Sequence, residues 1–181
     1  MNQFEASILL WIQENLRGLM DGFWVFVTHL GDGGYLWIAL GIVLLFFKKT
    51  RPIGFTVLIS LLINFIITNI TLKDLIARPR PFVVNDAIVT LIREPKSFSF
   101  PSGHTSASFA AMLALSYWVP KKVGIPAIIL ASMIAFSRMY IGVHYPTDIL
   151  GGILVGFMSS IWAYYLVRRL GNMIKERKTN G

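Results

Sequence analysis

The sequence predicts an all-α protein: a polytopic bundle of five transmembrane helices, preceded by an amphipathic helix that lies in the membrane interface. The first observation is composition, since 55% of the 181 residues are hydrophobic and 14% are charged, with a mean hydropathy of +0.62. The second is the length of the uncharged runs. Residues 52–72 and 149–167 carry no charge, and as helices they can cross most or all of a hydrocarbon core of about 30 Å.

The spans are expected in the following order. Residues 2–30 are amphipathic, with apolar residues at helical spacing and interruptions at Gly18 and Gly22, which favours an interfacial helix. The five spans follow at residues 33–47, 52–72, 104–119, 121–137 and 149–167. If residues 4–30 cross the membrane instead, there are six spans; the scarcity of basic residues before Lys48 favours five. No repeat divides the chain, so residues 1–181 are expected to form one membrane-embedded domain.

The charges predict the orientation. Ten basic residues occur with a single acid, Glu176, in two loops and the tail: Lys48, Lys49, Arg51, Lys121, Lys122, Arg168, Arg169, Lys175, Arg177 and Lys178. The other eight acids lie at the opposite ends of the spans. The positive-inside bias therefore places the C-terminus in the cytoplasm and the acidic ends outside. Topology accounts for most of the net charge of +8, and no nucleic-acid partner is expected.

Six further basic residues fall on the outer side, which this bias should deplete: Lys73, Arg78, Arg80, Arg93, Lys96 and Arg138. A solvated loop with local ion pairs explains three of them, including Arg78. The other three, Lys73, Arg80 and Arg138, lie at span ends, where a charge near hydrocarbon is costly. These three indicate a bound anion.

Prolines fix the backbone around Arg80. Pro79 and Pro81 each remove a donor and restrict the preceding residue, so we expect the helix carrying Lys73 to end near Ala77, followed by an extended segment.

Residues 98–109 contain the start of a helix. Pro101 suits a helix start, Ser102 can cap the helix or donate its hydroxyl, and Gly103 lets a ligand approach the backbone. Free amides and the positive end of the helix dipole attract anions there, and His104 stands beside them.

A second histidine precedes another helix start. Pro146 indicates that start, and His144 and Asp148 can meet across its first turn. A carboxylate on one imidazole nitrogen fixes the tautomer and leaves the other nitrogen free to react. A buried histidine satisfied by its aspartate would have the same pattern. The third histidine, His29, is expected to pack at the interface, and Asp32 to serve as a turn residue.

Together these clusters resemble the type 2 phosphatidic acid phosphatase family, membrane phosphatases whose site is related to that of vanadium haloperoxidases. The matching signatures lie within residues 73–148, with no departure at a signature position. They are Lys73, six residues, Arg80-Pro81; Pro101-Ser102-Gly103-His104; and Ser137-Arg138, five residues, His144, three residues, Asp148.

The resemblance implies catalytic roles for three residues. His144 would attack phosphorus to give a phosphohistidine, with Asp148 orienting it. His104 would protonate the leaving oxygen and then activate the water that hydrolyses the intermediate.

It also implies how the phosphate is held. The equatorial oxygens would be bound by Lys73, Arg80, Arg138, the Ser102 hydroxyl and the Gly103 amide. Neither a metal nor another cofactor would be needed.

The implied substrate is a lipid phosphate or diphosphate at the outer face of a bacterial plasma membrane, such as undecaprenyl diphosphate, phosphatidylglycerol phosphate or phosphatidic acid. A lipid phosphotransferase with the same intermediate is an alternative. A transporter or anion-binding protein is a third reading, and His104 and His144 argue against it because binding needs no nucleophile. The lipid and the oligomeric state are not predicted.

Overall fold

The computed structural model describes residues 3–179, and all its regular elements over that range are helical. The expected single domain covers residues 1–181. The structure does not describe residues 1–2 and 180–181 of it, nor the side chain of Lys178. In chain order the elements are α1 (Gln3–Leu16), α2 (Asp21–His29), the 3₁₀ turn η1 (Asp32–Gly34), α3 (Tyr35–Phe46), α4 (Arg51–Phe65), the π-helix η2 (Ile66–Leu72), α5 (Lys73–Ile76), α6 (Pro81–Val84), α7 (Gly103–Ser116), α8 (Lys121–Tyr140) and α9 (Pro146–Thr179).

Within residues 3–179, four helical stretches are long and apolar enough to cross a membrane: Asp21–Phe46, Arg51–Val84, Lys121–Tyr140 and Pro146–Arg177. The expected count of five is therefore approximate. The expected span 104–119 corresponds to α7, which has only 14 residues. The expected span 33–47 is extended by α2 across a kink at two glycines with positive φ, Gly33 and Gly34.

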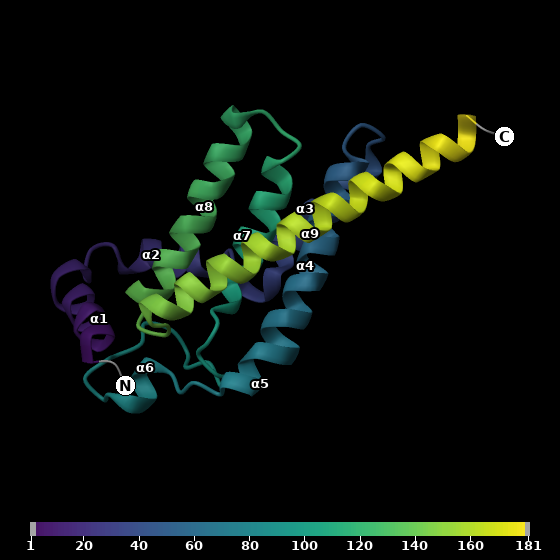
Figure 1. Cartoon of the computed structure of the whole chain (residues 1–181). Coiled ribbons are helices and arrows are strands. Elements are labelled where there is room, and N and C mark those ends of the chain that lie inside the picture. Colours follow the sequence, from purple (N-terminus) through teal and green to yellow (C-terminus); the bar gives the residue numbers. More distant parts are fainter. Residues whose placement is uncertain (1–2, 180–181) are drawn as a thin grey trace.

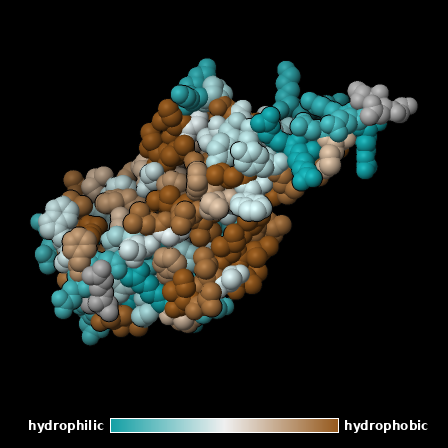
Figure 2. Space-filling model, viewed as in Figure 1, coloured by the Kyte–Doolittle hydropathy of each residue, from teal (hydrophilic) through white to brown (hydrophobic). Residues whose placement is uncertain are grey.

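The surface agrees with a membrane environment. Figure 2 shows apolar residues over the middle of the molecule and hydrophilic residues toward its two ends. Large apolar side chains such as Phe46 and Trp162 are mostly exposed, which is unfavourable in water and favourable in lipid.

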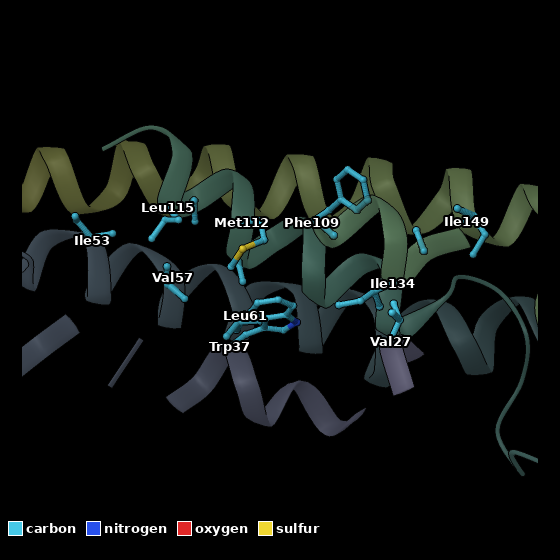
Figure 3. Packing of buried hydrophobic residues seen from close by; sticks show 14 residues of the cluster. Val27, Trp37, Ile53, Val57, Leu61, Phe109, Met112, Leu115, Ile134 and Ile149 are labelled. Atoms are coloured by element: carbon cyan, nitrogen blue, oxygen red, sulfur yellow. The ribbon is translucent and has the colours of Figure 1, made fainter. Parts of the chain in front are cut away.

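Helix α7 forms the centre of the bundle, packed by α4, α8 and α9 (Figure 3). One face of α7 is made of small residues, and Ala110, Ala111 and Ala114 on it are fully buried. On α9, Gly156 lies against the α7 backbone: a Cβ added there would be 2.7 Å from the Ser106 carbonyl oxygen. Close approach of two backbones therefore depends on residues without large side chains.

Helix α1 matches the first half of the predicted amphipathic segment 2–30, and residues 3–20 belong to none of the candidate spans. The second half of that segment differs from the prediction, because α2 lies within the candidate span Asp21–Phe46. Its buried face, which includes Leu9 and Ile12, packs at the end of the bundle where α8 ends and α9 begins (Figure 1). Arg17, just after α1, donates to the carbonyl oxygens of Tyr140 (2.7 Å) and Val89 (2.7 Å). These bonds tie the N-terminal segment to α8 and to the long loop after α6.

We expect Gly156→Ala to destabilise the protein by roughly 1–3 kcal/mol, because the added methyl group must push α7 and α9 apart. Gly171→Ala is the matched control on the same helix, where an added Cβ meets nothing within 4 Å. Thermal unfolding in detergent measures both. A Gly156→Ala protein as stable as the Gly171→Ala protein would show that α7 and α9 are not held at this contact.

Candidate active site

The predicted site residues meet at the end of the bundle where α7 and α9 begin and α8 ends (Figure 1). A cavity of ≈ 410 Å³ opens there. Of the eight predicted residues, six line it: Lys73, Arg80, Gly103, His104, Arg138 and His144. The other two, Ser102 and Asp148, are fully buried and do not line it.

The local structure around these residues is as predicted. Helix α5 ends at Ile76, Ala77 adopts a left-handed conformation (φ 48°), and residues 77–80 are without regular structure before α6. Ser102 caps α7, with its Oγ accepting from the Thr105 amide at 3.4 Å. Helix α9 begins at Pro146. The Ser102 hydroxyl, predicted to touch phosphate, is thus engaged within the first turn of α7.

His144 and Asp148 form the predicted pair. Nδ1 of His144 lies 3.3 Å from Oδ2 of Asp148, and Nε2 lies 3.3 Å from a guanidinium nitrogen of Arg80. This arrangement assigns the imidazole hydrogen to Nδ1 and the lone pair to Nε2, which accepts from Arg80 at the cavity wall. Burial, reinforced by the charges of Arg80 and Arg138, lowers the pKa of His144 to about 3 although Asp148 opposes the shift. The imidazole is therefore neutral at neutral pH, as a nucleophile must be.

Asp148 is held by more than the histidine. Its Oδ2 also accepts from the Tyr145 amide at 2.9 Å and from the Ser99 hydroxyl. Its Oδ1 accepts from Arg78 at 2.7 Å. Ser99 was not among the predicted site residues, although it lies in the same Phe-Ser-Phe-Pro-Ser-Gly-His stretch as the helix start. Its fully buried hydroxyl orients the carboxylate that orients His144.

Arg78 was expected in a solvated loop, and that expectation is wrong. Its side chain is only 22% exposed and also donates to Glu5 on α1 at 2.6 Å. Burial raises the pKa of Glu5, but hydrogen bonds from Thr147 and the ion pair with Arg78 outweigh it, so the net pKa is lowered. Glu5 is therefore ionised at neutral pH and completes a chain of charges from α1 through Arg78 to Asp148.

The three predicted cations differ in how they are satisfied. Arg80 donates to the carbonyl oxygens of Ser97 (2.6 Å) and Val143 (3.0 Å), so it also braces the backbone around the cavity. Lys73 makes only a long contact with the Ser97 hydroxyl, at 3.4 Å. Arg138 donates one nitrogen to Thr28 at 2.6 Å. Its Nε is buried and is the one such side-chain atom without a partner in the part of the chain that the structure describes.

His104 has a carboxylate partner that was not among the predicted site residues. Its Nε2 lies 2.8 Å from Oδ1 of Asp32, and Oδ2 of Asp32 lies 2.7 Å from Nδ1 of His29. The expectations of a turn residue for Asp32 and an interfacial packing role for His29 are thus incomplete, since neither included this hydrogen bond between them. The available signal was weak: an aspartate in a glycine-rich turn on the outer side, three residues after a histidine.

Comparisons with known proteins identify the family of this chain. Residues 52–172 match the PAP2 superfamily. The chain is 31% identical over 177 residues to an undecaprenyl-diphosphatase of Sulfolobus acidocaldarius, covering 95% of this chain and 85% of that protein. It is 33% identical over 146 residues to undecaprenyl-diphosphatase BcrC of Bacillus subtilis, covering 78% and 72%.

A solved structure extends the similarity to the fold. It is that of a transmembrane PAP2-type phosphatidylglycerolphosphate phosphatase from Bacillus subtilis, with a TM-score of 0.73, 28% identity and coverage of 96% of this chain and 89% of that one. The family match covers more than half of the chain and includes all three predicted clusters. The chain therefore belongs to the PAP2 superfamily and is an integral membrane lipid phosphatase.

Proposed function

We propose that this protein removes phosphate from a lipid phosphomonoester or diphosphate at the outer face of the membrane, through a phosphohistidine on His144 and without a metal. The observation that carries the proposal is the unpartnered Nε of Arg138, a residue that lines the same cavity as both histidines. Leaving a buried donor unsatisfied costs roughly 1–3 kcal/mol, and a phosphate oxygen would supply the missing acceptor.

In the first step, Nε2 of His144 attacks phosphorus and a P–N bond forms as the bond to the leaving oxygen breaks. His104 gives that oxygen its proton. Positive charge from Lys73, Arg80 and Arg138 stabilises the transferring group, aided by the amide end of α7. Asp148 stabilises the positive imidazole of the phosphohistidine.

In the second step, water attacks phosphorus and the P–N bond breaks. His104, now neutral, accepts the proton of the attacking water, and inorganic phosphate leaves. Over the two steps His104 returns to its starting state, so no net proton is consumed at the site. The positive side chains supply the charge that a divalent cation supplies in other phosphatases, and no group of three or more metal-ligating side chains occurs within residues 3–179.

A second cavity supports a lipid substrate. It has a volume of ≈ 490 Å³ and shares Lys73, Gly103 and His104 with the phosphate cavity. From there it continues along α3 and α4 past apolar residues such as Leu62 and Phe65, both of which are more than half exposed. A phosphate at the shared residues would therefore leave its apolar tail between the helices and next to lipid. Undecaprenyl diphosphate and phosphatidylglycerol phosphate, named in the relatives, are the substrates we propose first.

We expect the purified protein to release inorganic phosphate from at least one member of a panel of undecaprenyl diphosphate, phosphatidylglycerol phosphate and phosphatidic acid, with a chelator present. His144→Ala should lower this release at least about 1,000-fold, since loss of a nucleophile removes the covalent route. Unchanged thermal unfolding of the variant is the control. Activity that disappears with the chelator and returns with magnesium, or turnover retained by His144→Ala, contradicts the mechanism.

We expect Ser99→Ala to lower kcat roughly 10-fold with little change in KM, because a hydrogen bond to a buried charged group contributes about 1.5–3 kcal/mol and Ser99 does not line the cavity. Ser132→Ala is the control, since this exposed serine on α8 bonds only to the Ile128 carbonyl in its own helix. Phosphate release against substrate concentration separates kcat from KM. Equal activity of the two variants would remove Ser99 from the site.

The outward orientation can be tested with single cysteines, because the sequence has none. Asp86→Cys lies in the exposed loop at the site end, and Lys122→Cys lies at the exposed start of α8 at the other end. In intact cells an impermeant thiol reagent should label the first protein, and the second only after lysis. The reverse pattern would place the site in the cytoplasm.

A further inference from the structure

We propose that Asp32 is a positioning residue that holds His104 protonated and correctly oriented, and that His29 in turn holds Asp32. This inference rests on the proposed function, in which His104 is the general acid. It adds the η1 turn and the end of α2 to a site that the sequence signatures confine to residues 73–148.

The geometry fixes the imidazole of His104 on two sides. Its Nε2 donates to Asp32 at 2.8 Å. Its carbon edge packs on Gly31, where an added Cβ would come within 2.8 Å of Cδ2. The opposite edge, with Nδ1, has no hydrogen-bond partner among residues 3–179 and is left for the substrate. Asp32 therefore sets both the tautomer and the direction of the nitrogen that would give up the proton.

The charges around His104 explain why it needs a carboxylate. Three cations line its cavity, Lys73 from α5, Arg80 before α6 and Arg138 from α8. Each of them disfavours a second positive charge on His104. Burial lowers the pKa of His104, Arg138 and Lys73 lower it further, and the hydrogen bond and charge of Asp32 oppose that shift. The remaining charged groups on the cavity wall are Arg93 and Glu94, of opposite sign, and His144, which is neutral. Asp32 is the carboxylate in hydrogen-bond contact with His104. Its negative charge offsets the nearby cations and favours the protonated form of His104, which the general acid requires.

His29 holds Asp32 from the other side. Its Nδ1 donates to Oδ2 of Asp32 at 2.7 Å, while His104 uses Oδ1. The two histidines bind different oxygens and do not converge on one point, which argues against a metal site here. Because the side chains of Asp32 and His29 are about half exposed, this bond keeps the carboxylate from turning into water.

Asp32→Asn tests the proposal, because it keeps the size and an acceptor oxygen but removes the charge. Asp86→Asn, an exposed acid in the loop after α6, is the control. The measurement is kcat/KM for a lipid alkyl phosphate and for p-nitrophenyl phosphate, because kcat/KM excludes hydrolysis of the phosphoenzyme. The leaving group of the lipid is an alkoxide, which must be protonated by the general acid, whereas the leaving group of the aryl ester is nitrophenolate, which is stable without a proton. We expect a loss of roughly 10- to 100-fold for the lipid and less than about threefold for the aryl ester.

The pH dependence gives a second readout. Without the charge of Asp32, protonated His104 is less stable and loses its proton at lower pH. The alkaline limb of the kcat/KM profile for the lipid should therefore move to lower pH in Asp32→Asn and stay in place in Asp86→Asn. An equal loss for both substrates, or an unmoved alkaline limb, would show that Asp32 only shapes the turn, and the proposal would be wrong.

His29 provides an independent variant if Asp32→Asn does not fold, which thermal unfolding reveals. His29→Ala should show the same dependence on the leaving group but a smaller loss of kcat/KM, about 3- to 10-fold for the lipid. His29→Asn should restore activity, since its amide can donate from near the position of Nδ1. No difference between the two His29 variants overturns the role of His29. A wild-type protein inactive on every lipid phosphate overturns the proposed function, and this inference with it.

Discussion

The buried carboxylate of Asp148 is the interaction on which the site end of the molecule depends. It is fully inaccessible to solvent, and an isolated ion in such a place costs several kcal/mol. The cost is met by donors from separate segments: Arg78 after α5, Ser99 before α7, and the Tyr145 amide and His144 before α9. Satisfying one charge therefore brings these segments together, so the same contacts determine the local fold and the orientation of the proposed nucleophile.

Arg78 extends this constraint to the N-terminus. Because its other guanidinium nitrogen is bound by Glu5, helix α1 is connected to Asp148 through a single side chain. A helix whose sequence shows only amphipathicity is thus part of the structure that supports the pair of His144 and Asp148. Glu5 also accepts a hydrogen bond from the Thr147 amide at the start of α9. Displacing α1 would therefore leave Arg78 with one carboxylate instead of two and would leave the Thr147 amide without its acceptor.

The features that could be predicted from the sequence are those set by local chemistry. Pro146 and the spacing of His144 and Asp148 determine a helix start and a contact across one turn, and both were found. The contacts of Asp32 with His104 and of Glu5 with Arg78 were not predicted, because each joins residues more than 70 positions apart. Their pairing depends on how α1, η1 and α7 pack, and a single sequence carries no periodic signal for that.

The two histidine–carboxylate pairs have the same chemistry in different surroundings, and the surroundings separate their roles. His144 and Asp148 are almost completely buried, which disfavours a charged imidazole and keeps the proposed nucleophile neutral. Burial and the charge of Arg138 also lower the pKa of His104, but its half-exposed partner Asp32 opposes that shift through a hydrogen bond and its charge. Two equivalent imidazoles in one cavity would compete for the same proton. The two pairs are unequal because Asp148 is buried and Asp32 is half exposed, and the proposed roles of nucleophile and general acid require such a difference.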